Sequence, residues 1–533
     1  MTNARLTNAA VAEYRPPGAP AGEINFLGTT ARRWRTELAR VLTEIDAEVL
    51  TLNTHQVAEL ALAMTELAED LQSDSGLWRE LEAANRALFG TPLPLVWRMG
   101  DSALAPFDAR RFRFFLHGIW RHFKPDCNVS PAHRGFAAAA NRAATFFAGA
   151  LAERSRASSV AAFLGTVNAR GWEVKRKLIW LGTRSFLFRF FHADYLARNP
   201  PQDGDLIGTT DDFLCQECTA WSGLGALDLL AAVLDLSETD RAVLRGWHER
   251  HAAFYRVDAL QARGATIETM TAVNLINSQT YTVRLEMPRT RCPFAPARMV
   301  FGSLVPWRGE WYWSGGQKCY PQVPSDFSTI KRGMIEKNPS IVYRYRADLA
   351  ERAQRTVAEQ RAAFIRFHGS DLAVFPDGLT AAAAEQRQMR EQIETRMGTG
   401  LPDYLAQHGL DRTGPKLSWP TKLIECRRGV ALFYHEGEGV DLMADFEVLR
   451  RALGRTGTAL AEDEAEVLRA FVESAEISPA FVRRAIQEHG SAGLAAWYFL
   501  PTGDAAEVEY LLRRFKGAYY RRRYPNISLL GAD

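Results

Sequence analysis

The chain has 533 residues, more than the ~250–300 at which a single hydrophobic core usually stops growing, so two or more domains are expected. Its 47% hydrophobic and 24% charged residues are typical of a folded protein and exclude wholesale disorder. The net charge of +3 is nearly balanced, which excludes a general attraction to nucleic acid. Any such binding must come from clustered basic residues.

The N-terminal segment does not resemble a secretory signal, because the sequence PPGAP at 16–20 stands where an apolar signal core would lie. No stretch approaches the ~18 consecutive apolar residues that a membrane helix needs. We therefore expect a cytoplasmic protein with no membrane partner. Its six cysteines are too sparse for a disulfide scaffold and are expected to be reduced.

Residues 1–25 are predicted to be a flexible tail, because prolines and Gly18 interrupt regular structure and few apolar residues compensate. Beyond them, apolar residues recur at helical spacing, and Asn53 with Gln56 matches a helix-capping pair. This pattern predicts a helical domain over 26–204.

Residues 205–325 are predicted to hold a helical hairpin followed by a small SH3-like or OB-like β-barrel, because the hydrophobic pattern changes there from helical to alternating. On the last strand, Trp311 and Trp313 alternate with Tyr312, so the two indoles share one face and are predicted to pack. The expected strands are 253–258, 265–273, 279–286, 298–306 and 311–315.

Helical patterns return after the predicted barrel. Residues 326–420 are predicted to be a helical linker region, and 421–533 a β-hairpin at 423–434 followed by a C-terminal helical domain with a basic last helix. The predicted fold class is mainly α with an inserted small antiparallel β-barrel, an α+β, multi-domain arrangement.

The sequence CQEC gives Cys215 and Cys218 the C-x-x-C spacing that zinc and redox sites use. A structural zinc needs two more ligands, and Cys292 and Cys319 flank the last predicted hairpin at an unusual spacing. Two ordinary helical cysteines are the commoner interpretation. No cofactor is therefore predicted, and zinc is the one metal left open.

Two further segments pair histidine with acidic residues: His192 with Asp194, and His435 with Glu436 and Glu438. Either could bind a metal or act as acid and base, because histidine titrates near neutral pH. Neither matches a known metal spacing, and phosphate-loop, dinucleotide and nucleophile-elbow signatures are absent. Catalytic residues therefore stay unassigned, and the sequence does not decide whether the protein is an enzyme.

Three basic runs combine arginine or lysine with aromatic residues, at 110–124, 175–190 and 511–525. Single-stranded nucleic acid requires such cations beside aromatic faces. Similar runs also occur where aromatics pack inward and arginine stems cover them. The residues predicted to contact nucleic acid are Lys175, Arg176, Lys177, Arg513, Arg514, Lys516, Tyr519, Tyr520, Arg521, Arg522 and Arg523.

Residues 205–320, with LCQECTAWSGLGALDLL, NSQTYTVR and MVFGSLVPWRGEWYWSGG, resemble a helix-plus-small-β-barrel module of uncharacterised bacterial proteins. Some of those proteins also carry a SEC-C metal-binding tail, whose cysteine cluster is missing here. The resemblance implies a bacterial cytosolic protein of unassigned activity. It transfers no site residue.

The leading hypothesis is a binding or regulatory protein, associated with RNA, single-stranded DNA or a ribonucleoprotein through the basic runs. One alternative is an enzyme of unfamiliar type with a site between the helical domain and the barrel, using His192, Asp194, or Cys215 with Cys218. The second alternative is a scaffold for a protein partner in a defence or stress system. The oligomeric state is not predicted.

Overall fold

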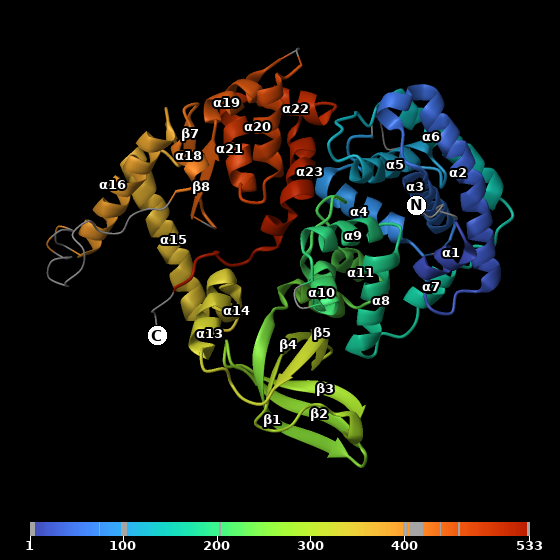
Figure 1. Cartoon of the computed structure of the whole chain (residues 1–533), viewed down its shortest axis with the longest axis horizontal. Coiled ribbons are helices and arrows are strands. Elements are labelled where there is room, and N and C mark those ends of the chain that lie inside the picture. The colour runs from blue at the N-terminus through green and yellow to red at the C-terminus, as the bar shows by residue number, and fades with distance from the viewer. Residues whose placement is uncertain are drawn as a thin grey trace. The chain divides into compact units, whose positions relative to one another are not determined.

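The structure is a computed structural model in which the chain forms two compact units (Figure 1). Unit 1 comprises Met1–Ser325 and Asp504–Ala518, and unit 2 comprises Asp326–Gly503 and Tyr519–Asp533. The residues that the structure describes are 6–73, 75–96, 104–201, 204–397, 400, 403, 419–437, 439–456 and 459–529.

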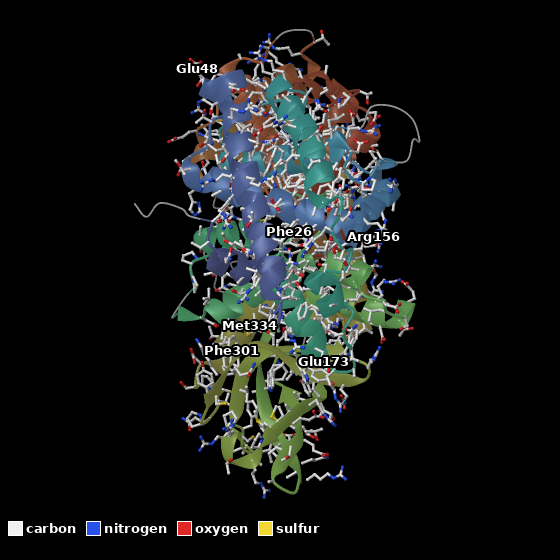
Figure 2. All side chains as sticks on the ribbon, turned by 90° about the vertical axis from the view of Figure 1, so that its right-hand side faces the viewer. Phe26, Glu48, Arg156, Glu173, Phe301 and Met334 are labelled. Atoms are coloured by element: carbon white, nitrogen blue, oxygen red, sulfur yellow. The ribbon has the colours of Figure 1, made fainter. Side chains whose placement is uncertain are left out.

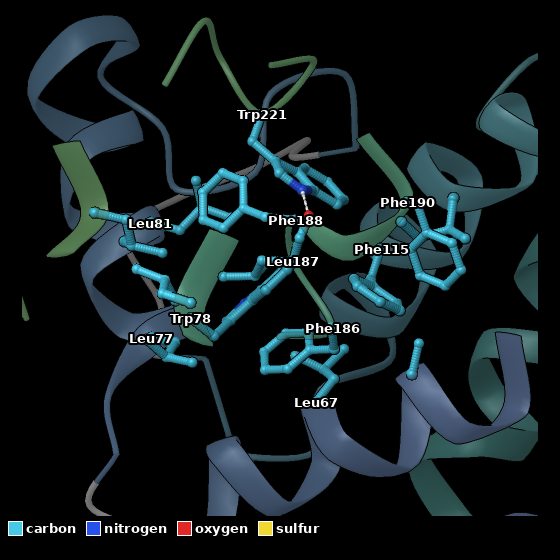
Figure 3. Close-up of a cluster of buried hydrophobic side chains, with 14 of the residues drawn as sticks. Leu67, Leu77, Trp78, Leu81, Phe115, Phe186, Leu187, Phe188, Phe190 and Trp221 are labelled. Atoms are coloured by element: carbon cyan, nitrogen blue, oxygen red, sulfur yellow. Dashed lines mark hydrogen bonds between the residues drawn. The ribbon is translucent and has the colours of Figure 1, made fainter. Parts of the chain in front are cut away.

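Unit 1 is built mainly from helices packed around one large hydrophobic core. Trp78, Phe115 and Trp221 are buried members of this core, and the Trp221 and Phe115 rings stack with centroids 5.9 Å apart (Figure 3). Trp221 Nε1 donates to the Leu187 carbonyl at 2.7 Å, so its one polar atom is satisfied. The helices are α1 (Asn8–Tyr14), α2 (Ala21–Leu50), α3 (Thr54–Gln72), α4 (Leu77–Phe89), α5 (Ala109–Phe123), α6 (Arg134–Leu151), α7 (Ser159–Leu164), α8 (Gly171–Arg184), α9 (Arg189–Arg198), α10 (Leu206–Gln216), α11 (Ala226–Val233), α12 (Glu238–Arg245) and α23 (Ala505–Lys516).

The predicted flexible tail is wrong for residues 8–25, which form α1 and the start of α2. The Thr7 side chain caps α1 by accepting from Ala10 N at 3.2 Å, and Val11 is fully buried. Arg15 is buried in ion pairs with Glu23 and Glu69. These long-range contacts order a segment whose own composition favours disorder.

Five strands of unit 1 close into a ring in the order β1-β2-β3-β5-β4, with β4 returning to β1. The pairs are antiparallel except β3 with β5, which is parallel at Val283 and Trp311, so the predicted purely antiparallel order is wrong there. The SH3-like or OB-like identity stays a prediction. The strands are β1 (Ala252–Arg263), β2 (Thr266–Asn274), β3 (Thr280–Pro288), β4 (Met299–Trp307) and β5 (Glu310–Tyr320).

Strand β5 joins the ring to the helices because its two faces pack differently. Trp311 contacts Tyr281 with ring centroids 4.6 Å apart, and Trp313 contacts Tyr255 at 5.4 Å. Tyr312 instead belongs to the helical core, and its ring lies directly against Gly171 of α8. A Cβ at Gly171 would come within 2.6 Å of that ring, so only glycine permits this approach.

Unit 2 packs helices on a three-stranded antiparallel sheet in the order β6-β7-β8. The predicted hairpin at 423–434 is displaced: it lies at β7 and β8, and the short strand β6 was not predicted. The elements are α13 (Phe327–Lys337), α14 (Ser340–Tyr343), α15 (Ala347–His368), β6 (Leu372–Phe375), α16 (Gly378–Met397), α18 (Thr421–Ile424), β7 (Val430–His435), β8 (Gly439–Ala444), α19 (Phe446–Gly454), α20 (Glu462–Glu473), α21 (Pro479–His489) and α22 (Ala492–Tyr498).

The two units divide the chain differently from the predicted domains. The predicted linker region, 326–420, belongs to the same unit as the sheet that follows it, and the basic last helix, α23, belongs to unit 1. Leu511 and Leu512 of α23 are buried, so burial of its apolar face accounts for this placement. In the described parts of the chain, no helix combines the length and apolarity needed to cross a membrane.

Candidate functional site

Helix α8 carries the basic tripeptide Lys175-Arg176-Lys177, which the sequence assigned to one nucleic-acid surface. The helix starts where the Glu173 carboxylate accepts from Arg170 N at 2.9 Å. Successive side chains on a helix point about 100° apart, so the three cations face three different surroundings. Only Arg176 is exposed.

Lys177 is 1% exposed, and its ammonium binds the loop between α7 and α8. Its Nζ donates to the Thr166 carbonyl at 2.5 Å and to Asn168 Oδ1 at 2.6 Å. The pKa of Lys177 is lowered to about 8 because the ammonium is buried. The nearby Glu173 carboxylate favours the charged form and so partly opposes this shift. These contacts occupy the ammonium that was predicted to bind nucleic acid.

Lys175 takes part in an ionic junction between α8, α10 and the strand ring, formed by Lys175, Asp211, Arg250, Ser314 and Cys215. Its Nζ pairs with the Asp211 carboxylate, donates to Ser314 Oγ at 3.0 Å and lies 3.7 Å from Cys215 Sγ. Burial lowers the pKa of Lys175, and Cys215 opposes that shift.

Asp211 is the centre of the ionic junction, because two cations share it. Arg250 Nε lies 2.9 Å from Asp211 Oδ2, and the Ser314 hydroxyl donates to the same oxygen at 2.8 Å. Arg250 also donates to Ser303 Oγ of β4 at 2.8 Å. Asp211, Arg250, Ser303 and Ser314 are each at most 5% exposed, and the Lys175 side chain is 13% exposed. The junction therefore fastens the ring to the helices, as buried ion pairs do when every partner is present.

The ionic junction lies between helices and ring, as the site of the enzyme alternative would, and of the residues named for that alternative it includes Cys215 alone. Ser314 beside a lysine resembles a nucleophile and base. However, Ser314 is 2% exposed and donates its proton to Asp211, so we assign it to the attachment of the ring. Sequence reasoning missed Asp211, Arg250 and Ser314. The pair of adjacent acids in TTDDFL, inside an otherwise uncharged helix, was the available signal.

The C-x-x-C pair does not act as one unit. Cys215 is buried on α10 beside Lys175, whereas Cys218 follows the end of α10 and packs against Gly517. None of the four cysteines considered for zinc, including Cys292 and Cys319, is in a disulfide bond. Burial and the neighbouring Cys292 raise the pKa of Cys319. Among the residues that the structure describes, no group of three or more His, Cys, Asp or Glu could hold a metal.

The predicted histidine and acid pairs are also separated. His192 Nε2 lies 3.2 Å from Thr210 Oγ1, while Asp194 faces His122, with Oδ2 2.7 Å from Nδ1. Residues two apart on a helix point to different faces, which explains this. His435 Nδ1 accepts from Gly437 N at 3.1 Å, and Glu436 is 81% exposed beside Arg361. Glu438 lies outside the described residues.

The first basic run, on α5, is largely internal. Phe112, Phe115 and Trp120 are fully buried. Arg111 pairs with Glu82 at 2.6 Å, and Arg110 pairs with Asp108 at 2.6 Å. This run matches the alternative in which aromatics pack inward and arginines pair with acids.

The last basic run is divided between the two units. In unit 1, Arg513 pairs with Glu509 at 3.1 Å and Lys516 is 2% exposed. Arg514 lines a small cavity with His117 and Trp221. Burial, together with Arg514 and Arg121, lowers the pKa of His117 to about 3. These cations serve the packing of α23.

In unit 2, the same run and α21 contribute to a surface of three exposed arginines and three half-buried tyrosines that we call the Arg/Tyr face: Arg483, Tyr519, Tyr520, Arg522, Arg523 and Tyr524. Its guanidinium carbons lie over tyrosine rings, Arg522 at 4.3 Å from Tyr519, and Arg523 at 5.6 Å from Tyr524. Arg483 lies 5.8 Å from the Tyr520 ring and donates to its hydroxyl at 2.8 Å. Arg521 ends the 3-10 turn η4 (Gly517–Arg521) and is half-buried.

No family of known proteins, no curated protein and no solved structure matches this chain. The bacterial module proposed for residues 205–320 therefore rests on sequence pattern alone.

Proposed function

We propose that the protein binds single-stranded RNA or DNA through the Arg/Tyr face of unit 2. One observation carries the proposal: three guanidinium groups lie over three tyrosine rings on one short C-terminal segment and the neighbouring α21. Arg522 and Arg523 are exposed at its end.

The chemistry of this face suits a flexible, unpaired strand. Guanidinium groups bind phosphates with paired hydrogen bonds, and both guanidinium and tyrosine planes offer surfaces on which bases stack. Stacking does not read the identity of a base, so we expect binding with little sequence preference. Because the net charge of +3 is nearly neutral, the affinity for nucleic acid must come from the local contacts of this face. We therefore expect the affinity to be modest and to decrease as the salt concentration rises.

The test is fluorescence anisotropy of labelled oligothymidylate and oligouridylate with the full chain at low and moderate salt. The double variant Arg522→Gln/Arg523→Gln should weaken binding about tenfold or more and reduce the slope of log affinity against log salt by about 1 to 2. The matched control is Arg352→Gln/Arg355→Gln, which removes the same charge from an exposed part of α15.

Two results would reject the proposal. One is the absence of any anisotropy change at low salt with micromolar protein. The other is an equal loss of binding in both double variants, because this would show that net charge matters and the Arg/Tyr face does not.

A further inference from the structure

Unit 1 contains a cavity of about 750 Å³ that is open to solvent, and among its lining residues only Arg176 belonged to a predicted site. Its walls come from the turn between α1 and α2, the loop before α7, α7 itself and one side chain of α8. Figure 2 views this side of the molecule and labels Phe26 on α2 and Arg156 in the loop before α7. The volume falls within the ~300–1,000 Å³ of ordinary small-molecule sites.

Two arginines, Arg154 and Arg176, line the cavity. The guanidinium carbon of Arg154 lies 4.4 Å from the Phe26 ring centroid, and that of Arg176 lies 5.9 Å from the Phe163 ring centroid. Neither guanidinium has a hydrogen bond or ion pair to any residue that the structure describes. Their donors are therefore available to a ligand, while the rings hold the planes in place.

The acidic residue of the cavity wall, Glu23, does not neutralise these arginines. Glu23 is 6% exposed, and its carboxylate pairs with Arg15 and accepts a hydrogen bond from Ser159 N at 3.0 Å. Burial alone would raise the pKa of Glu23, but Arg15 and Ser159 hold it below its usual value. The Glu23 carboxylate is thus charged, and its oxygens already bind Arg15 and Ser159.

The remaining walls add one hydrogen-bond donor and an apolar surface. Ser155 Oγ accepts from Ala157 N at 3.1 Å, which leaves its hydroxyl proton to donate into the cavity. Pro17, Pro20 and Phe163 provide apolar contacts. A ligand that fits has an anionic end for the two guanidinium groups and a larger apolar or aromatic body.

We propose that this cavity binds a phosphate-bearing small molecule with an aromatic body, of the nucleotide class. Arginine pairs make bidentate hydrogen bonds to phosphate oxygens, which suits a diphosphate better than a lone carboxylate. The ring of the ligand would lie against Pro17 and Pro20, which are exposed. The site is separate from the Arg/Tyr face and does not depend on the proposed function.

Isothermal titration of the full chain with ADP and with inorganic pyrophosphate tests the proposal. ADP should bind saturably and more tightly than pyrophosphate, because only ADP has an aromatic body. Arg154→Gln/Arg176→Gln should weaken ADP binding by about tenfold or more, the loss expected for about 1.4 kcal/mol. Arg184→Gln, an exposed arginine on the same helix, should leave it unchanged.

A second variant keeps the test informative if the arginine changes disturb folding. Ala162 lines the cavity and is exposed, so Ala162→Trp should fill the space and block ADP without removing a charge. Arg522→Gln/Arg523→Gln should retain ADP binding, which separates this proposal from nucleic-acid binding. The proposal is overturned if ADP gives no saturable heat at millimolar concentration, or if the wild type and both cavity variants bind ADP equally.

Discussion

The Lys-Arg-Lys run of α8 and the Arg-Arg-Arg run at 521–523 look alike in sequence but differ in how far their cations are exposed to solvent. On α8, a helix surrounded by other elements, two of the three cations turn inward and become structural. At the C-terminus, the chain leaves its last helix, and Arg522 and Arg523 stay exposed beside tyrosines. A dense basic run is therefore evidence of a binding surface only where packing leaves its cations outside.

The largest effect is expected for the inward-facing cations of α8, and Asp211→Asn tests it. The change leaves Lys175 and Arg250 without their shared carboxylate, and losing one partner of a buried ion pair costs about 3–5 kcal/mol. Urea unfolding monitored by circular dichroism and tryptophan fluorescence measures the loss. Asp212→Asn is the control, because its side chain is 47% exposed and its pair with Arg250 should contribute less than about 1 kcal/mol. Equal costs would refute a special role for the ionic junction.

The second prediction concerns His117, beside Arg514 of the divided C-terminal run. The unfolded chain takes up this proton near pH 6.5, whereas the folded protein does so only near pH 3. Stability is therefore lost as pH falls from about 6.5 to about 3, by up to about 1.4 kcal/mol per pH unit. His117→Gln cannot take up this proton. The amount by which its melting temperature lies below that of the wild type should therefore become smaller as the pH falls from about 6.5 to about 3.

The control for His117 is His55→Gln, at an exposed position on α3. Its melting temperature should follow that of the wild type at every pH. A constant gap between His117→Gln and the wild type would show that His117 does not resist protonation in the folded state.

The third prediction compares neighbours on α8 and has the smallest expected effect. Lys177→Met leaves the Thr166 carbonyl and Asn168 without their donor and should cost about 1–3 kcal/mol. Arg176→Gln should change stability by no more than about 0.5 kcal/mol, because that side chain is exposed. Thermal melts of the two variants provide the measurement, and similar losses would contradict the assignment of Lys177 to the interior and Arg176 to the surface.

Local sequence features anticipated several elements of the fold. The capping pair at Asn53 and Gln56 and the alternating strand containing Trp311 and Trp313 both occur as predicted. Each of these depends on contacts between residues close in sequence, which propensity and spacing describe well. The flexible tail failed because Arg15 finds its partners at Glu23 and, far along the chain, at Glu69.

The candidate sites were much less predictable, since each combines distant segments. Nothing local to Arg154 indicates that Arg176 shares its cavity, and nothing local to Lys175 indicates that its ammonium pairs with Asp211 and donates to Ser314. The predicted pairs, Cys215 with Cys218 and His192 with Asp194, were chosen for closeness in sequence, and packing directed their members to different neighbours.

By itself, the sequence determined that the chain is mainly helical, contains a run of alternating strands and carries three basic runs. Only the tertiary structure decided which cations are buried, which face solvent and which line a cavity. The physical reason is that a helix turns successive side chains by about 100°, so the neighbours packed on each face set the surroundings of each charge.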